Sequence, residues 1–330
     1  KHVMQYKVTY RDNQIKGEVD LPKSKSISNR LMILSALSGG KVSVKQPSAS
    51  DDTQIMQNLI QTNDGTKDAG HAGTVMRFLT SYFAVKGRNI TLTGSERMKQ
   101  RPIGELVKCL NEIGAGIEYK EKEGYPPLYI PGNKLISKRL NIDSGISSQF
   151  ISSLLMIAPY INSGLELELT GKRISNSYIE MTIRLMEMAG ARISFNHNII
   201  CVEEGKYRQM EVEAEPDWSA ASYWFMMAGL AESSDVLLKG LKKESLQGDA
   251  KLTEIFSRLG VISDFEEKGL RLKKGSIPHD TFRYNFIENP DVVQSVVPYC
   301  IFQGIPFDIE GCISLKIKET DRIAALYKEL

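Results

Sequence analysis

The stretch Leu21-Pro-Lys-Ser-Lys-Ser-Ile-Ser-Asn-Arg30 brings two lysines, three serines and an arginine to the start of an apolar segment, Leu31 to Leu37. The first turn of a helix leaves backbone N–H groups unpaired and carries a partial positive charge. Cationic and hydroxyl side chains around such a turn favour the binding of phosphate or carboxylate. An ordinary capped helix with solvated lysines is the alternative that this stretch alone leaves open.

The same arrangement, a small or polar segment followed by an apolar helix, recurs later in the chain. The later apolar helices are expected at residues 78–85, 150–158, 223–230 and 292–302. Matching positions ahead of them follow at steps of 74, 72 and 72 residues, and they are Gly73, Ser147, Ser219 and Asp291. A second series of helices, each ending on a glycine and followed by an alternating segment, is expected at 106–114, 183–190 and 255–260. This period predicts about four copies of one module of helices and strands, and hence an α/β fold.

Length and composition are those of an ordinary globular protein with more than one domain. A single hydrophobic core rarely grows past about 250–300 residues, and this chain has 330. Hydrophobic residues make up 42% of the chain and charged residues 25%, with a net charge of +2. This near-neutral balance argues against a nucleic-acid-binding protein with a broad basic face and favours local pockets for small anions.

The cysteine spacing and the apolar runs indicate which kinds of metal, redox and membrane protein can be excluded. The cysteines form no CxxC pair, so we expect reduced thiols and no zinc site. They are Cys109, Cys201, Cys300 and Cys312. No apolar run approaches the roughly 20 residues of a membrane span, and no signal peptide opens the sequence. We therefore expect a cytoplasmic protein that has no membrane contact and uses neither metal nor redox chemistry.

Other polar clusters also stand at expected helix starts. Arg97-Met-Lys-Gln-Arg-Pro-Ile103 places two arginines before a proline, and guanidinium groups suit carboxylate or phosphate. Ser147-Ser148-Gln149 could aim polar groups at a ligand, although helix capping is the simpler explanation, and Ser175 and Tyr178 have the same standing. Residues 316–322 contain five charged groups, for which a solvated helix face is the alternative.

Asp291 and Glu319 provide two carboxylates among these cations. Asp291 follows Pro290 and precedes an almost uncharged helix, so capping alone would explain its position. The pair also offers what general acid–base catalysis needs, beside lysines and arginines that would hold an anionic substrate. The sequence has no Ser–His–Asp arrangement, no GxxxxGK(S/T) loop and no GxGxxG after a strand, which argues against nucleotide and dinucleotide chemistry.

Six motifs in one order resemble the EPSP synthase (3-phosphoshikimate 1-carboxyvinyltransferase) family. They are LPxSKSxSNR, AGTxMR, GSxRMxxRPI, SSQ, PD and KETDR, and they run in one register from about Tyr6 to Leu330. The resemblance implies an enolpyruvyl-transferase fold of two domains, each built from three βαβαββ units. We expect one discontinuous domain of residues 1–20 plus 217–330, with its second half incomplete, and a second domain of residues 21–216.

The resemblance also implies a reaction. The enolpyruvyl group of phosphoenolpyruvate would pass to the 5-hydroxyl of shikimate 3-phosphate, giving 5-enolpyruvylshikimate 3-phosphate and phosphate in chorismate and aromatic amino-acid biosynthesis. The implied course is addition followed by elimination, with no cofactor. Family members are cytoplasmic, are taken to be monomers and are the target of glyphosate.

Residue roles follow from matched positions. Asp291 is implied as the base on the 5-hydroxyl and Glu319 as the proton donor to the methylene carbon. Lys25 is implied as a third catalytic residue, which contacts both substrates and assists proton transfer. Residues implied to hold shikimate 3-phosphate are Ser26, Arg30, Ser147, Ser148, Ser175, Ser314 and Lys318. Residues implied to face phosphoenolpyruvate are Gly73, Arg101, Gln149 and Arg322.

The chain departs from the family pattern in several places. His71 stands where asparagine is usual, Phe78 replaces the usual proline, and Ser314 stands where asparagine often contacts the shikimate ligand. The stretch between Asp52 and Gly70 is short, which predicts that one unit has lost part of its hairpin. By repeat logic a further unit is expected to follow the helix that begins near Glu319, and we expect the 330-residue chain alone to be weak or inactive.

Two alternatives stay open at this point. The first is a UDP-N-acetylglucosamine enolpyruvyl transferase, which shares the fold but carries a reactive cysteine before its RP motif. Residues 97–101 contain no cysteine, and Cys109 falls inside the expected next helix. The second is a non-catalytic relative that binds phosphorylated metabolites, against which the retained Lys25, Asp291 and Glu319 argue.

Overall fold

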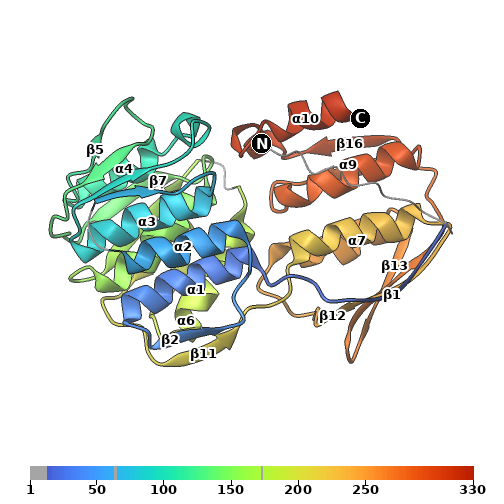
Figure 1. Cartoon of the computed structure of the whole chain (residues 1–330), viewed down its shortest axis with the longest axis horizontal. Coiled ribbons are helices and arrows are strands. Elements are labelled where there is room, and N and C mark those ends of the chain that lie inside the picture. Colours follow the sequence, from blue (N-terminus) through green and yellow to red (C-terminus); the bar gives the residue numbers. More distant parts are fainter. Residues whose placement is uncertain (1–12, 63–64, 172–173) are drawn as a thin grey trace.

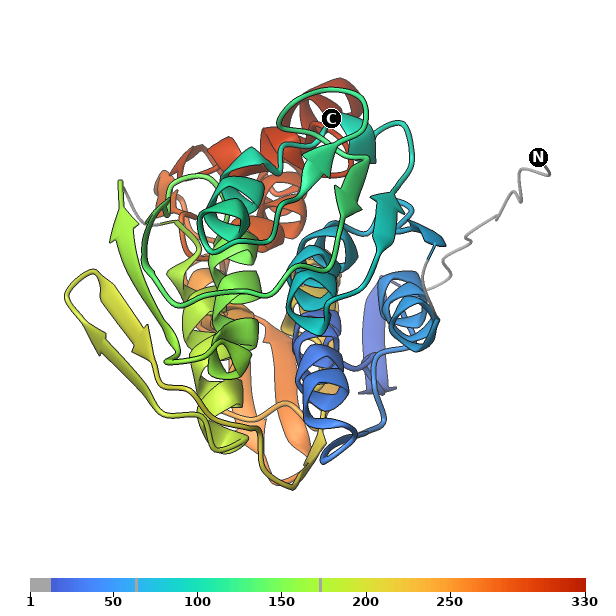
Figure 2. The same cartoon turned by 90° about the vertical axis from the view of Figure 1, so that its left-hand side faces the viewer.

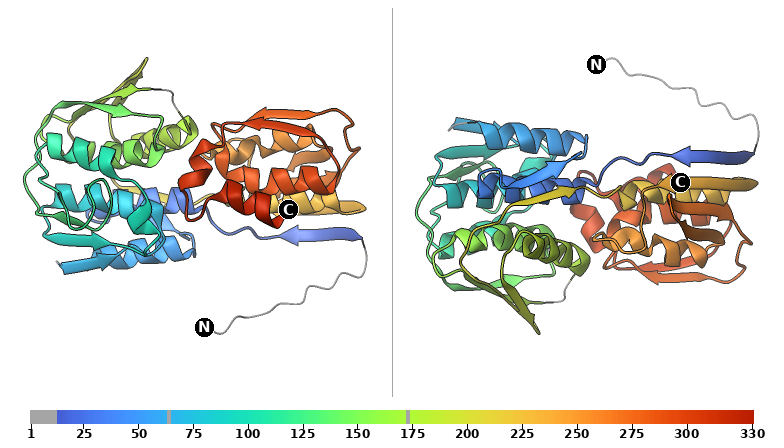
Figure 3. Two further views of the ribbon diagram at one scale, coloured as in Figure 1. Left: turned by 90° about the horizontal axis from the view of Figure 1, so that it is seen from above. Right: turned by 90° about the horizontal axis from the view of Figure 1, so that it is seen from below.

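A computed structural model describes residues 13–62, 65–171 and 174–330 as two lobes that lie side by side (Figure 1). Views from above and below show the same two lobes beside each other (Figure 3). The chain crosses between them near residues 20–24 and 214–217. These crossovers run antiparallel and are joined by hydrogen bonds from the Ser24 amide to the Glu215 carbonyl and from the Asp217 amide to the Pro22 carbonyl, both 2.8 Å.

The first lobe contains two complete copies of the predicted module. One copy consists of β3 (Gly65–Asp68), α3 (Gly73–Lys86), β4 (Ile90–Thr93), α4 (Gly104–Glu112), β5 (Glu118–Tyr119) and β6 (Leu128–Ile130). The other consists of β7 (Arg139–Asp143), α5 (Ser148–Ile157), β8 (Leu165–Thr170), α6 (Asn176–Met188), β9 (Ile193–Asn196) and β10 (Ile199–Val202). Their sheets have matching orders, β3-β4-β6-β5 and β7-β8-β10-β9, with the first pair of strands parallel in each. The repeat read from the sequence is therefore confirmed as a βαβαββ unit.

A third unit of this lobe is shorter. It is formed by α1 (Lys25–Ser38), β2 (Val42–Lys45), α2 (Asp51–Gln61) and the distant β11 (Met210–Glu213). β11 pairs with β2 in parallel. Because α2 ends at Gln61 and β3 begins at Gly65, no hairpin fits between them, as the short spacing predicts.

The second lobe repeats the same module. Its first unit joins β1 (Gln14–Val19) to α7 (Trp218–Leu230), β12 (Ser233–Lys239), α8 (Leu252–Ser257), β13 (Val261–Glu266) and β14 (Gly269–Lys274) in a sheet of order β1-β12-β14-β13. β1 is parallel to β12, so this first strand pairs with a segment that lies far along the chain. Then follow β15 (Phe282–Asn285), α9 (Val293–Phe302), β16 (Phe307–Glu310) and α10 (Arg322–Glu329). Short 3₁₀ turns lie at Met98–Gln100 (η1), Ala158–Tyr160 (η2), Gly248–Lys251 (η3), Pro290–Val292 (η4) and Ile313–Ile317 (η5).

Each lobe has its own hydrophobic core, formed by one cluster of buried apolar side chains. One is built from residues between 27 and 214, and the other from Leu21 and residues between 218 and 315. Helices α1, α3 and α5 bury most of their residues, because they lie inside the first lobe while strands occupy its outside (Figure 2). This explains why their sequences are apolar around most of the helix rather than along one stripe. None of the helices among the described residues is long and apolar enough to cross a membrane.

Gly229 of α7 gives a test of the second core. A Cβ at this position would lie 2.4 Å from the buried Tyr299 ring, whose hydroxyl donates to the Leu259 carbonyl and so fixes the ring. We expect Gly229→Ala to lower the free energy of unfolding by about 1–2 kcal/mol despite its better helix propensity. Gly205→Ala, where a Cβ meets nothing within 4 Å, is the matched control. Equal stability of both variants in thermal or urea unfolding would contradict this packing.

Candidate functional site

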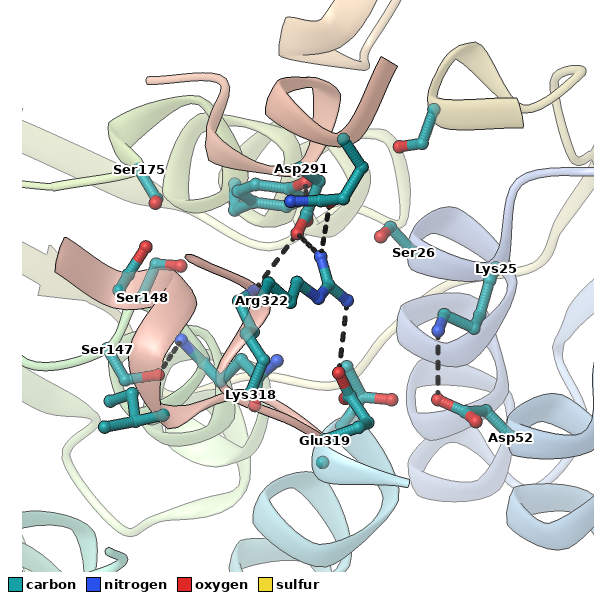
Figure 4. Close-up of a pocket in the computed structure, with 18 of the residues that line it drawn as sticks. Lys25, Ser26, Asp52, Ser147, Ser148, Ser175, Asp291, Lys318, Glu319 and Arg322 are labelled. Atoms are coloured by element: carbon teal, nitrogen blue, oxygen red, sulfur yellow. Dashed lines mark hydrogen bonds and ion pairs between the residues drawn. The ribbon is translucent and has the colours of Figure 1, made fainter. Parts of the chain in front are cut away.

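A cavity of about 1060 Å³ lies between the lobes and is lined by residues of both (Figure 4). Every site residue proposed from the sequence contributes to its wall. These are Lys25, Ser26, Arg30, Gly73, Arg101, Ser147, Ser148, Gln149, Ser175, Asp291, Ser314, Lys318, Glu319 and Arg322. Residues far apart in the sequence are thus brought to one place, whereas their individual roles stay predictions.

Several helices begin at this cavity. The first residues of α1, α3, α5 and α10 line it, as do the residues at the start of α7. Each start contributes unpaired N–H groups and a partial positive charge. The repeat explains the convergence, because equivalent helices of equivalent units point the same end toward the gap between the lobes. The cavity is therefore suited to an anionic ligand.

Two carboxylates that sequence reasoning missed surround Lys25 at the start of α1. The Lys25 ammonium lies 3.2 Å from Asp52 of α2. The Lys25 backbone N–H donates to Asp217 Oδ2 at 3.2 Å, and the other oxygen of Asp217 accepts from the Ala220 amide at 2.9 Å. Asp217 thus connects the first turns of α1 and α7, one in each lobe. In the structure each aspartate lies at the start of a helix, and Asp217 alone precedes a helix that the sequence predicts.

Arg30 is buried among neutral partners. Its guanidinium donates to the hydroxyls of Thr182 (2.6 Å) and Ser152 (3.2 Å) and to the Tyr178 carbonyl (3.3 Å), with no carboxylate among these partners. The guanidinium also lies over the rings of Phe78 and Tyr178, at 5.4 and 5.8 Å from their centroids. Burial lowers the pKa of Arg30 to about 10, so the group stays cationic at neutral pH. Its charge is available to an anion in the cavity.

Arginines of the first lobe reach across to the segment before α10. Arg101 is 5% exposed, donates to the Ile317 carbonyl at 3.2 Å and pairs with Glu319 at 3.3 Å. Arg97 donates to the Lys318 carbonyl. Gly73 lies against the Arg101 guanidinium, since a Cβ there would come within 2.7 Å of it. The Arg97–Ile103 cluster is therefore part of the contact between the lobes and not a solvated basic turn.

Asp291 lies at the centre of the ionic network. Its Oδ1 accepts from Arg322 at 2.9 Å and lies 3.3 Å from the Lys318 ammonium, while its Oδ2 accepts from the Tyr178 hydroxyl at 2.8 Å. Burial by itself would raise the pKa of Asp291, but the charges of Lys318 and Arg322 hold it well below the ordinary carboxyl value. Asp291 is therefore ionised at neutral pH, and its side chain accepts bonds from other residues instead of capping the helix that follows.

Glu319 shares Arg322 with Asp291. One carboxylate oxygen lies 3.3 Å from Arg101 and the other 3.1 Å from Arg322. Burial would raise the pKa of Glu319, but the charges of Arg101 and Arg322 lower it overall. Arg322 also donates to Gln294 Oε1 at 2.9 Å, a contact that the sequence motifs do not predict. Two ionised carboxylates are thus held by one arginine, with further cations on either side.

The serines of the cavity divide into two kinds. Ser147 caps α5, accepting from the Gln149 amide at 3.3 Å, so the capping interpretation is confirmed for it. Ser175 precedes α6 in a left-handed conformation, with φ of 53°, and its side chain makes no capping hydrogen bond. Its hydroxyl is consequently not engaged at the start of its own helix.

Asp249 is a buried acid that sequence reasoning also missed. It accepts a 2.5 Å hydrogen bond from Ser219, which lies in the first turn of α7. Burial, followed by the charge of Asp291, raises the pKa of Asp249 to about 7. Asp249 is not among the residues that line the cavity, but it lies directly behind Ser219, which is one of them.

Comparison with known proteins identifies the family. A model of the EPSP synthase (3-phosphoshikimate 1-carboxyvinyltransferase) family matches residues 10–63 and 57–330. The chain belongs to the EPSP synthase family. The two matched segments overlap at residues 57–63, a range that includes the end of α2.

Individual relatives agree with this membership. A 3-phosphoshikimate 1-carboxyvinyltransferase of Bacteroides fragilis (strain YCH46) is 44% identical over 319 residues, which cover 96% of this chain and 78% of that protein. The protein of the same description in Haemophilus ducreyi is 32% identical over 356 residues, covering 96% and 79%. A solved EPSP synthase from Acinetobacter baumannii matches with a TM-score of 0.74 over 95% of this chain and 77% of that chain, at 19% identity, which supports the enolpyruvyl-transferase fold.

Two departures from the EPSP synthase pattern have visible contacts. The His71 ring lies 2.9 Å from the Ser95 hydroxyl and is not among the residues that line the cavity. Phe78 is fully buried and packs on Arg30. The phenylalanine therefore takes part in holding a cationic residue of the site, which a proline ring could not do in the same way.

The depressed pKa of Asp291 predicts a pH-dependent contribution to stability. Because its carboxyl pKa is lower in the folded chain than in the unfolded chain, the stabilisation is present above about pH 4 and is lost as pH falls through the folded pKa. We expect Asp291→Asn to reduce thermal stability at pH 7, with a difference from the wild type that shrinks toward pH 3. Asp264→Asn on β13, an exposed position, is the control. A difference that is constant with pH would contradict the ion-pair network.

Proposed function

We propose that the chain transfers the enolpyruvyl group of phosphoenolpyruvate to the 5-hydroxyl of shikimate 3-phosphate, releasing phosphate. The observation that carries this proposal is the pair Asp291 and Glu319, both bound to Arg322 at the edge of a cavity bordered by helix starts and cations. Each of the two substrates carries a phosphate and a carboxylate, so binding both together requires a site of strongly positive potential. Family membership supports the identity of the two substrates.

Two groups of residues would hold the substrates. Gly73 at the start of α3, together with Arg101, Gln149 and Arg322, would bind phosphoenolpyruvate, because guanidinium forks suit its carboxylate and phosphate. Lys25 lies where both substrates would meet. The residues proposed for shikimate 3-phosphate are Ser26, Arg30, Ser147, Ser148, Ser175, Ser314 and Lys318.

Asp291 would act as the base for the addition step. Its carboxylate is ionised, so it has a lone pair for the proton of the 5-hydroxyl as the oxygen attacks C2 of phosphoenolpyruvate. Lys318 and Arg322 lower its basicity in the free cavity, and anionic substrates that compete for these cations would raise its pKa. Lys318 and Arg322 would keep the carboxylate oriented. A C–O bond forms at C2 while C3 receives a proton, giving a tetrahedral intermediate.

Glu319 would supply the proton to C3. In the free cavity Arg101 and Arg322 favour its ionised form, which a proton donor must leave. Phosphoenolpyruvate would compete for both arginines and add negative charge beside Glu319, and both effects raise a carboxyl pKa. In the elimination step Glu319, now a carboxylate, would take a proton back from the new methyl group as the C–O bond to phosphate breaks, which gives the enolpyruvyl ether. The phosphate would leave beside Lys25 and carry away the proton that Asp291 had accepted.

We propose further that residues 21–216 and residues 1–20 plus 217–330 are two domains that act as a monomer. The two separate apolar clusters support this division, although Leu21 packs with the second cluster. The described cavity is lined by residues of both lobes of one chain, which favours a monomer.

A phosphate-release assay tests the proposed activity. With phosphoenolpyruvate and shikimate 3-phosphate we expect phosphate release that is detectable but weak for the 330 residues alone. We expect none when UDP-N-acetylglucosamine replaces shikimate 3-phosphate. Release only with the nucleotide sugar would favour the other enolpyruvyl transferase. Tight binding of shikimate 3-phosphate without any phosphate release would favour a non-catalytic phospho-metabolite-binding protein.

Removal of either carboxylate should abolish most turnover. We expect Asp291→Ala and Glu319→Ala each to lower kcat by roughly 10²–10⁴-fold, since each removes a proton-transfer group. Circular dichroism should report an intact fold. Wild-type rates in either variant would exclude that residue from the proton-transfer steps.

Gly73→Ala should weaken the binding of phosphoenolpyruvate more than that of shikimate 3-phosphate. The added methyl group would push the Arg101 guanidinium, the flexible end of a side chain, away from its contact with Glu319. We expect the KM for phosphoenolpyruvate to rise about tenfold, with a smaller change for shikimate 3-phosphate and little loss of stability. Equal changes in both KM values would place Gly73 and Arg101 away from the phosphoenolpyruvate subsite.

A further inference from the structure

The loop before α9 in the second lobe is hydrogen-bonded to the start of α6 in the first lobe. The Ser175 amide donates to the Ile287 carbonyl at 2.8 Å. The Ser177 amide donates to Glu288 Oε2 at 3.0 Å, and the Ser177 hydroxyl donates to the Glu288 carbonyl at 2.9 Å. The Tyr178 hydroxyl donates to Asp291 three residues further along the loop. This contact therefore links the first turn of α6 to the carboxylate proposed as the base.

Glu288 occupies the place that a helix cap normally fills. The first-turn amides of a helix need an acceptor, which is usually the side chain of the residue just before it. Ser24, Ser147 and Asp217 serve their own helices in this way. Ser175 does not, and the acceptor for α6 comes from Glu288 in the opposite lobe. A carboxylate is especially suited to this position because it also meets the positive end of the helix dipole.

The conformation of Ser175 depends on the same loop. A serine with φ of 53° is in the left-handed region, which costs roughly 1–2 kcal/mol for a residue other than glycine. The Ile287 carbonyl holds the Ser175 amide in that conformation. Because Glu288 supplies the cap, the Ser175 hydroxyl is not needed at the helix start, and Ser175 lines the cavity.

We propose that Glu288 is a positioning residue for the substrate site: it caps α6 from the opposite lobe and thereby presents the Ser175 hydroxyl to shikimate 3-phosphate. The proposal rests on the proposed function for the identity of that ligand. In physical terms, the first turn of α6 and the loop 287–291 become ordered together. The Ser175 hydroxyl of one lobe and the Asp291 carboxylate of the other are therefore positioned at the same time. Without the carboxylate, α6 would recruit the nearest hydroxyl, that of Ser175, as its cap.

Binding of shikimate 3-phosphate to Glu288 variants tests this role. We expect Glu288→Ala to weaken binding about tenfold, the loss typical of a charged hydrogen bond. Glu288→Gln keeps a carbonyl oxygen for the Ser177 amide and should lie within about threefold of the wild type. Glu180→Ala, an exposed position on the same helix, is the matched control and should bind normally. Titration calorimetry gives all of these constants.

A double-mutant cycle separates positioning from general destabilisation. If Glu288 acts through Ser175, the effect of Glu288→Ala on affinity should nearly vanish in a Ser175→Ala background. Additive effects, equal weakening by the alanine and glutamine variants, or unchanged affinity in Glu288→Ala would each overturn the proposal.

A readout without ligand keeps this test separate from the proposed activity. We expect hydrogen exchange in the segment 174–181 to be faster in Glu288→Ala than in the wild type and near wild-type rates in Glu288→Gln. If the wild type fails to bind shikimate 3-phosphate while exchange changes as expected, the proposed substrate is wrong and the cap across the lobes stands. Unchanged exchange in Glu288→Ala would overturn the cap itself.

Discussion

The ion pairs of Arg322 with Asp291 and Glu319 are the interaction on which the arrangement of the site depends. Arg322 begins α10, Asp291 precedes α9, and Glu319 pairs in turn with Arg101 of the first lobe. One guanidinium therefore fixes two carboxylates and, through them, the segment 316–322 against the other lobe. Such pairs cost desolvation and hold only when several partners share the charge, which the surrounding Lys318 and Arg101 provide.

The repeated βαβαββ unit explains why so much positive potential meets in one place. Each unit turns the start of its first helix toward the gap between the lobes. The positive ends of the dipoles of α1, α3, α5 and α7 therefore add to the charges of Lys25 and Arg101. The interior helices carry few charges of their own, and the cavity receives its charges from their first turns. A modest net charge of +2 is consequently compatible with a strongly cationic site.

Local patterns in the sequence predict the parts of the structure that are themselves local. The spacing of Gly73, Ser147 and Ser219 predicts the repeat because each copy folds by the same short-range rules, and the motifs bring every proposed site residue to one cavity. Asp52, Asp217 and Glu288 were not predicted. Their partners, Lys25 and Ser177, lie far away along the chain. In addition, helix capping alone accounts for an aspartate at a helix start, so its sequence position gives no reason to expect a distant partner.

The two apolar clusters are separate, so the site between the lobes is assembled by other contacts. Each lobe buries its own core, whereas the contacts described across the cavity are polar: Arg97 to Lys318, Arg101 to Glu319, Tyr178 to Asp291 and Ser177 to Glu288. These bonds join buried or partly buried groups such as Arg101 and Asp291, so breaking one of them would leave a charge without its partner. The apolar core of each lobe does not depend on these contacts. An anionic ligand that joins cations of both lobes would add to the polar contacts that assemble the site.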